Sequence, residues 1–230
     1  MFACSCLLLA SAGMAVAQNI PAATLAKRVD AHYNHLRSLE TRYTERYQGM
    51  GIDRTETGTL TLLKPGRMRW AYDSPAGKLF LLDGKDAISY TPGDAEATRF
   101  PEKKLDDLRT PLRFLLGHTD LEKELQGLSV TLVNLDGQTG YTLWGTPAGM
   151  PPQRAEERLP GAQDVLQRVR AIGVTVDAQG IIHRLRIEET DGAITTFSFS
   201  DMRENVPTEE TEFRFVPPPG VTVIDGAAPI

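Results

Sequence analysis

The sequence predicts a mainly β protein, an incomplete, half-open antiparallel β-barrel with a helical lid that encloses an apolar cavity. Three observations predict it: long stretches in which apolar and polar residues alternate, turn signals between those stretches, and two segments with helical periodicity. A sheet of about twelve antiparallel strands curls as its twist accumulates, and amphipathic helices can cover its open side. Such a curved sheet can enclose a cavity.

The first element is a helix, predicted over residues 21–39. Pro21 stands near its start, and apolar residues such as Val29, Leu36 and Leu39 follow at three- and four-residue steps. This spacing gives the helix one apolar face, so it can pack on a sheet.

The period changes to two in the stretch that follows the helix. Met68, Trp70 and Tyr72 fall on one face of the predicted strand, whereas Arg67 and Arg69 fall on the other. We therefore expect one apolar face and one solvated face. The alternative for Met68, Trp70 and Tyr72 is that they are ordinary core residues without a role in binding.

The remaining elements follow from turns and breaks in this alternation. A leucine stripe predicts a second helical element over 103–126, kinked or split at Pro111, and the Pro- and Gly-rich stretch 147–164 predicts a surface loop. The order is one helix, about six strands, the helical insert and about six more strands, of which the last are predicted at 169–176, 181–188, 193–199 and 213–215. Turns are predicted at Lys64-Pro65-Gly66, Ser74-Pro75-Ala76-Gly77, Asp83-Gly84, Pro92-Gly93-Asp94, Asp136-Gly137 and Asp191-Gly192.

Residues 1–17 are predicted to be a secretory signal peptide. They carry no charged side chain and end in Ala15-Val16-Ala17, a small-residue cleavage site, so the mature chain is expected to be a single domain from 18 to 230. Both cysteines lie in the leader, which leaves the mature chain without a disulfide. No later stretch has the length of a membrane span, so we expect a soluble periplasmic protein and a monomer. A formal net charge of −5 argues against nucleic acid as a partner.

Patterns that would indicate catalysis or metal binding are absent from the sequence. His32 and His35 could share one helix face, but no cysteine or nearby acidic cluster completes a zinc site. Neither Ser74 nor Ser89 lies in a G-x-S-x-G turn. We therefore expect no enzyme, no metal and no cofactor.

The stretch from Gly58 to Tyr72 resembles the LolA family of periplasmic lipoprotein carriers. The family pattern is a glycine, a strand, a basic residue followed by proline, and a strand bearing tryptophan; here these are Gly58, Lys64-Pro65 and Trp70. Further matches follow in order at 83–90, 110–116, 177–183 and 213–223. Each match alone is weak, but the order and spacing of all five are specific.

The resemblance implies a carrier that takes acylated lipoproteins from an inner-membrane exporter and gives them to an outer-membrane acceptor. It implies that Lys64 is the latch of the lid, bonded to lid carbonyls in the closed state, and the end of the Thr110–Leu116 segment is the expected partner. The alternative is a solvated lysine at a turn. The family usually has arginine there and an aromatic residue at Met68, so both positions depart from the pattern. The expected lining of the lipid-binding cavity is Met68, Trp70, Tyr72, Val29, Leu36, Leu112, Leu115 and Leu116.

Two other classes of function remain open at this point. One is a periplasmic regulatory domain that senses lipid or lipoprotein, which would need a second domain or a partner-binding extension, whereas the chain ends soon after residue 223. The other is a lipid-modifying hydrolase, which would need a nucleophile or an acid–base pair. The related outer-membrane acceptor begins with an acylated cysteine, which this chain lacks. The sequence therefore favours the soluble carrier.

Overall fold

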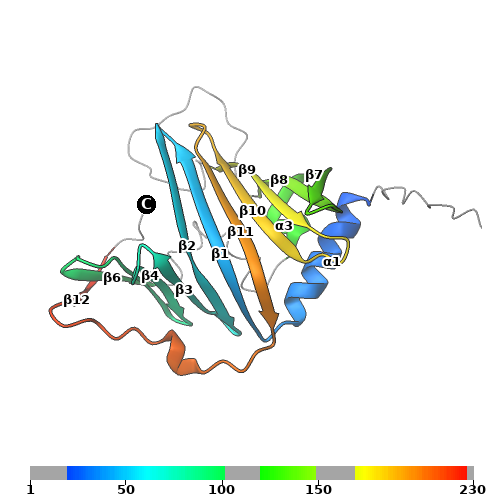
Figure 1. Ribbon diagram of the computed structural model, residues 1–230. Helices are drawn as coiled ribbons and strands as arrows, with labels where there is room; N and C mark the ends of the chain where they lie inside the picture. Colours follow the sequence, from blue (N-terminus) through cyan, green and yellow to red (C-terminus); the bar gives the residue numbers. More distant parts are fainter. Residues whose placement is uncertain (1–19, 102–119, 149–168, 227–230) are drawn as a thin grey trace, which may run out of the picture.

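The computed structural model describes residues 20–101, 120–148 and 169–226, and its strands form one open, strongly curved sheet (Figure 1). The sheet has 12 strands in the order β12-β6-β5-β4-β3-β2-β1-β11-β10-β9-β8-β7. The two outer strands do not pair with each other, so the barrel is incomplete. The predicted fold class is confirmed.

Two antiparallel meanders build this sheet, and the pairing of β1 with β11 joins them. The turns predicted between consecutive strands are found where the sequence placed them. The first meander is β1 (Ser38–Gly49), β2 (Ile52–Leu63), β3 (Arg67–Ser74), β4 (Leu79–Asp83), β5 (Asp86–Tyr90) and β6 (Glu96–Pro101). The second is β7 (Leu125–Leu135), β8 (Gln138–Pro147), β9 (Val169–Val176), β10 (Ile182–Glu189) and β11 (Ile194–Glu204), and β12 (Thr222–Asp225) pairs in parallel with β6.

Helix α1 (Ala22–His35) begins after Pro21 and ends earlier than predicted. The predicted helix continued to Leu39, but Leu36 is extended and Leu39 lies in β1. The backbone there pairs with the end of β11 instead: Arg37 N donates to Asn205 Oδ1 at 2.9 Å and Asn205 N donates to the carbonyl of Ser38. Tertiary contacts therefore end the helix where periodicity alone would continue it.

The helical insert also ends earlier than predicted, as its C-terminal part shows. A four-residue helix, α3 (Leu121–Glu124), is followed at once by β7, so the predicted helical range to 126 was wrong over its last two residues. The rest of the insert, with Pro111, lies outside the described residues, and so does the predicted loop from residue 149 onward.

The two faces of the sheet are named here by their side chains. The inner face carries Met68 and Trp70 and packs against α1 in the main apolar core, whereas the outer face carries Arg67 and Arg69. On β4, β5 and β6 the outer face is buried as well, because Leu81 and its neighbours form a second apolar cluster. The expectation of one solvated face is therefore wrong for these three strands.

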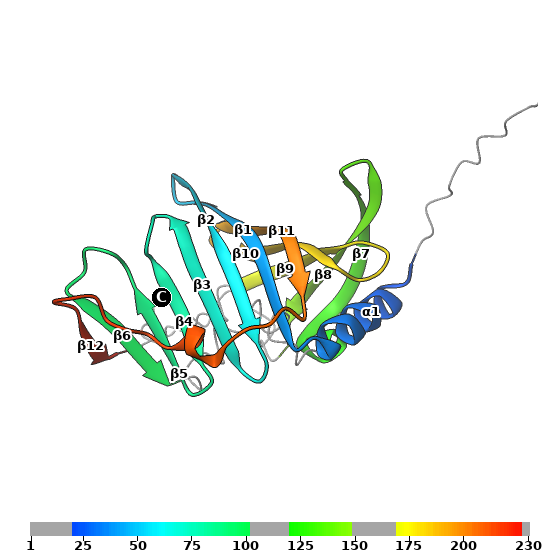
Figure 2. The same cartoon turned by 60° about the horizontal axis from the view of Figure 1, so that its bottom comes forward.

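The cover of this outer cluster is the segment 205–221, called the strap below. It crosses β3, β4 and β5 between the end of β11 and β12 (Figure 2), and its short 3-10 helix η3 (Glu210–Phe213) inserts Phe213 into the cluster. The strand predicted at 213–215 was wrong. Three consecutive prolines follow from Pro217, and proline cannot donate a backbone hydrogen bond to a neighbouring strand.

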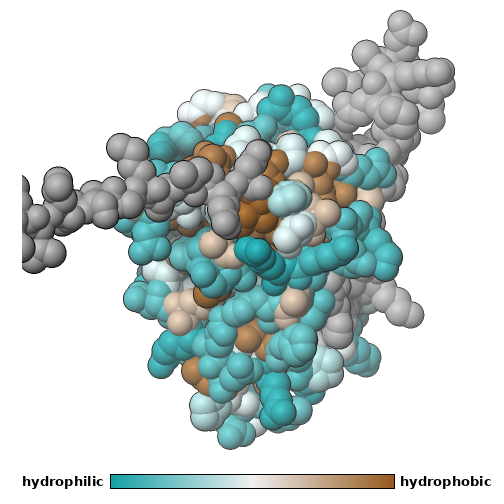
Figure 3. Space-filling model, turned by 90° about the vertical axis from the view of Figure 1, so that its right-hand side faces the viewer, coloured by the Kyte–Doolittle hydropathy of each residue, from teal (hydrophilic) through white to brown (hydrophobic). Residues whose placement is uncertain are grey.

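The side of the molecule that carries α1 and β7 is mostly hydrophilic, with hydrophobic residues gathered in patches (Figure 3). Strand β7 is the outermost strand there, and the side chain of Leu132 on it is half-exposed. No helix in the described ranges is long and apolar enough to cross a membrane.

Candidate functional site

The inner face of β3 brings together the three side chains that the period-two pattern placed on one face. Met68 and Trp70 are fully buried and Tyr72 is partly buried. Val29 of α1 and Leu36 just after it belong to the same apolar core. The structure therefore gathers five of the eight residues expected to line the cavity; the other three, Leu112, Leu115 and Leu116, lie outside the described residues.

Aromatic rings surround Trp70 on this face. Tyr43 meets its ring edge to face at 4.6 Å between centroids, and the ring of Phe197 lies 5.3 Å from it. The indole Nε1 points at the sulfur of Met68, 2.7 Å away. Thioether and aromatic groups are polarisable and adapt to irregular apolar partners, so this surface is suited to hydrocarbon chains.

Lys64 holds the end of α1 against this surface. Its Nζ donates to the backbone carbonyl of Tyr33 at 2.7 Å, in the last turn of the helix. This carbonyl also accepts a long bond of 3.4 Å from the N–H of Leu36. Carbonyls in the last turn of a helix lack the usual donor four residues on and carry partial negative charge, so a cation stabilises them. Burial lowers the pKa of the Lys64 ammonium. The family resemblance predicts that this lysine binds carbonyls of the lid. The partner predicted for it was the end of the 110–116 segment, which lies outside the described residues.

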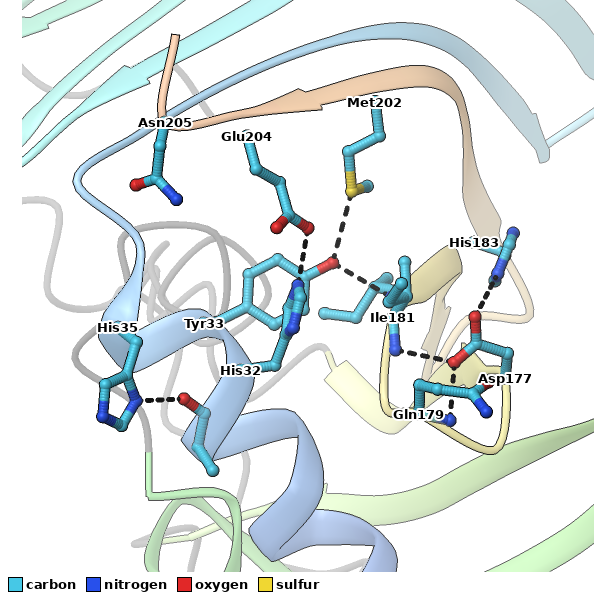
Figure 4. Close-up of polar contacts among 12 residues, drawn as sticks. His32, Tyr33, His35, Asp177, Gln179, Ile181, His183, Met202, Glu204 and Asn205 are labelled. Atoms are coloured by element: carbon cyan, nitrogen blue, oxygen red, sulfur yellow. Dashed lines mark hydrogen bonds and ion pairs between the residues drawn. The ribbon is translucent and has the colours of Figure 1, made fainter.

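The same helical turn has two further polar anchors, drawn in Figure 4. The hydroxyl of Tyr33 accepts a hydrogen bond of 3.0 Å from the backbone N–H of Ile182 and donates to the sulfur of Met202. Burial raises the pKa of this hydroxyl. His32 Nε2 lies 2.6 Å from the carboxylate of Glu204, at the end of β11. Sequence reasoning missed these contacts because the partners are about 150 to 170 residues away along the chain.

The middle of α1 rests on the turn between β9 and β10. Gly180 has a φ of +91°, and a side chain there would come within 2.9 Å of the backbone of Val29. The turn is held in shape by Asp177, whose carboxylate accepts from the N–H groups of Gln179 and Ile181 (Figure 4). Only glycine allows α1 to approach this closely.

A polar cluster lies on the inner face beyond Tyr72. Glu45 and Glu56 are directly opposite each other on β1 and β2. Lys78 bonds to Glu56 at 2.6 Å and lies over the ring of Tyr72, whose hydroxyl donates to Glu45 at 3.3 Å. Burial, followed by the charge of Glu56, raises the pKa of the Glu45 carboxyl.

No group of three or more histidine, cysteine, aspartate or glutamate side chains within 20–101, 120–148 and 169–226 is arranged to hold a metal ion. His183 pairs with Asp177 at 3.3 Å, and His35 Nδ1 contacts the carbonyl of Ala31 at the end of its own helix. These contacts stabilise a turn and a helix end.

Comparison with known proteins shows which proteins this open half-barrel covered by a helix is similar to. The family model described as "Outer membrane lipoprotein carrier protein LolA" matches residues 35–139. An outer-membrane lipoprotein carrier protein of Nitrosospira multiformis is 27% identical over 175 residues, which is 75% of this chain and 74% of the relative. One of Chromobacterium violaceum is 23% identical over 220 residues, or 95% and 97% of the two chains.

A solved structure shares the fold at low sequence identity. The crystal structure of an uncharacterized conserved protein from Thermus thermophilus superposes with a TM-score of 0.53 and 11% identity, over 88% of this chain and 97% of that chain. This structural likeness concerns the fold alone, and the sequence matches confirm the resemblance seen at Gly58–Tyr72. The chain is thus similar to the LolA family, by its model over residues 35–139 and by relatives that cover most of the chain.

Proposed function

We propose that this protein is a periplasmic carrier of lipoproteins, without enzymatic activity, that holds their acyl chains between α1 and the inner face of the sheet. In this proposal it takes its cargo from an inner-membrane exporter and gives it to an outer-membrane acceptor. The match to the LolA family and the names of the curated relatives support the cargo class. Export would follow from cleavage of the leader after Ala17.

The observation that carries the proposal is the bond between Lys64 and the last turn of α1. In the closed form Val29 and Leu36 pack into the same core as Met68 and Trp70, so a chain can occupy this space only after α1 moves away. The lid therefore competes with the cargo for one apolar surface. Polar anchors that stabilise the closed form oppose retention of the cargo and favour its release.

A single buried charge tests where the acyl chains bind. Met68→Glu places a carboxylate in the inner core, where an unpaired charge is costly beside hydrocarbon, so binding of a fluorescent acylated peptide should be lost. Met50→Glu is the matched control, because Met50 is exposed in the turn between β1 and β2. Circular dichroism checks that both variants are folded. A folded Met68→Glu variant that binds the peptide as the parent does would place the site elsewhere.

A further inference from the structure

The outer face carries a groove that the carrier function does not use. It has a volume of about 440 Å³ and lies between β3, β4 and β5 on one side and the strap on the other. Leu79 and Leu81 of β4 line it, and Phe215 of the strap lies 5.9 Å from the ring of Tyr90 across it. Small-ligand sites in proteins have volumes of roughly 300–1,000 Å³, so the groove is large enough to bind one or two side chains.

Two arginines line this groove without a partner. Arg69 points outward from β3, and Arg214 follows η3 in the strap. Within the described residues neither guanidinium makes a hydrogen bond or an ion pair, whereas the neighbouring Arg67 pairs with Glu210 at 3.2 Å. A guanidinium presents a planar fork of donors that matches a carboxylate or a phosphate. The groove therefore offers two unused anion-binding groups beside an apolar floor.

The rim adds an exposed apolar side chain. Val216 stands in the strap with 76% of its surface exposed, one of four large hydrophobic side chains exposed in the described ranges, and it lines the groove next to Phe215. An exposed valine alone needs no explanation, but here it lies beside two unpaired arginines and two aromatic rings. A ligand that fits must therefore combine an anion with an apolar group.

We propose that this groove binds a short peptide segment of a partner protein, in which a carboxylate stands next to an aliphatic or aromatic side chain. The carboxylate pairs with Arg69 and Arg214, and the apolar side chain packs on the partly exposed Leu79 and Phe215. Because the groove lies on the face opposite α1, a partner can bind there without displacing the lid. Binding of the peptide at this groove does not require the acyl cargo.

The charges around the groove favour a peptide over a membrane surface. Glu212 lines the groove, and Glu209 is the N-cap residue of η3 in the strap. The whole chain has a formal net charge of −5. A wide anionic surface would meet these carboxylates and be repelled, whereas a single carboxylate on a peptide can reach the two arginines between them.

The probe is a hexapeptide with one glutamate next to one phenylalanine among glycine and serine, amidated at its C-terminus and labelled with the net-neutral dye tetramethylrhodamine, and its binding is followed by fluorescence anisotropy. We expect saturable binding below about 1 mM that weakens with added salt. Arg69→Gln and Arg214→Gln should each weaken it about tenfold, because each removes a charged hydrogen-bond donor. Arg184→Gln is the matched control: it removes an exposed arginine of β10, far from the groove, and should change nothing. Peptides with lysine for glutamate, or serine for phenylalanine, should bind at least tenfold more weakly.

Several results would overturn the inference. One is the absence of saturable binding by the parent, and another is binding that the two arginine substitutions leave unchanged. Vesicles of phosphatidylglycerol and of phosphatidylcholine form a further arm. If the phosphatidylglycerol vesicles bind through Arg69 and Arg214 while the peptide does not, the groove is a lipid site and the peptide proposal is wrong. Thermal unfolding shows that the variants are folded, and Val216→Ser offers a second, uncharged variant with the same expected direction.

Discussion

Removing the amino group of Lys64 should weaken the closed lid by a predictable amount. A hydrogen bond from a charged donor contributes about 1.5–3 kcal/mol net. Lys64 is only partly buried, so the lower end applies, and about 1.5 kcal/mol shifts the balance between closed and open forms about tenfold. Lys64→Leu keeps the apolar stem but loses the bond to the Tyr33 carbonyl. It should therefore hold an acylated peptide about tenfold more tightly and release it correspondingly more slowly.

The assay is transfer of a labelled acylated peptide from each loaded variant to acceptor vesicles. Lys64→Arg should release faster than the parent, since a guanidinium can reach more than one carbonyl at the end of α1. Lys85→Leu, an exposed lysine in the turn between β4 and β5, controls for the loss of a positive charge and should behave as the parent. If Lys64→Leu releases as fast as the parent, Lys64 is not a latch and the role assigned to the 2.7 Å bond is wrong.

Two further predictions concern stability. Gly58→Ala should lower the free energy of unfolding by about 1–3 kcal/mol in urea titrations, because an added Cβ would lie 2.2 Å from the carbonyl oxygen of Ala71 and 2.6 Å from the hydroxyl of Tyr43; an unchanged midpoint would show that the strands yield easily. Glu45→Gln should raise the melting temperature near pH 7. In the folded protein the pKa of Glu45 is raised above its usual 4.5. Protonated Glu45 therefore stabilises the fold fully below pH 4.5, and this stabilisation is lost as the pH rises through the higher pKa of the folded state. The gain should therefore disappear near pH 4, and a gain that grew on acidification would contradict this sign.

Local patterns predicted most of the fold because they are visible in neighbouring residues. The period of two and the turn pairs placed β1 to β5, and the helical stripe placed α1. The strap is different. Some of its residues are apolar, but its course over the sheet is set by its run of three prolines and by contacts with strands more than 100 residues earlier in the chain. The end of α1 is likewise set by Asn205. Such long-range contacts leave no periodic signal.

The candidate site divides in the same way. The alternation within β3 was sufficient to place Met68 and Trp70 on one face, and the family resemblance pointed to Lys64. The partner of Lys64 was not predictable from position, since the choice of Tyr33 depends on how α1 crosses the sheet. The same holds for the anchor between His32 and Glu204, which are 172 residues apart. Two partly exposed helix histidines give no hint of this contact.

The proposed carrier function depends on binding of the acyl chain at the inner face of the sheet. Photo-cross-linking can show which face the acyl chain contacts. Photo-reactive benzoylphenylalanine is placed at Tyr72 on the inner face or at Tyr90 on the outer face, two partly buried tyrosines of similar size. Each variant is loaded with an acylated peptide and irradiated, and the mass of the product is measured by intact-protein mass spectrometry. We predict an adduct with the acyl chain at position 72 and none at position 90. An adduct at 90 without one at 72 would refute binding at the inner face.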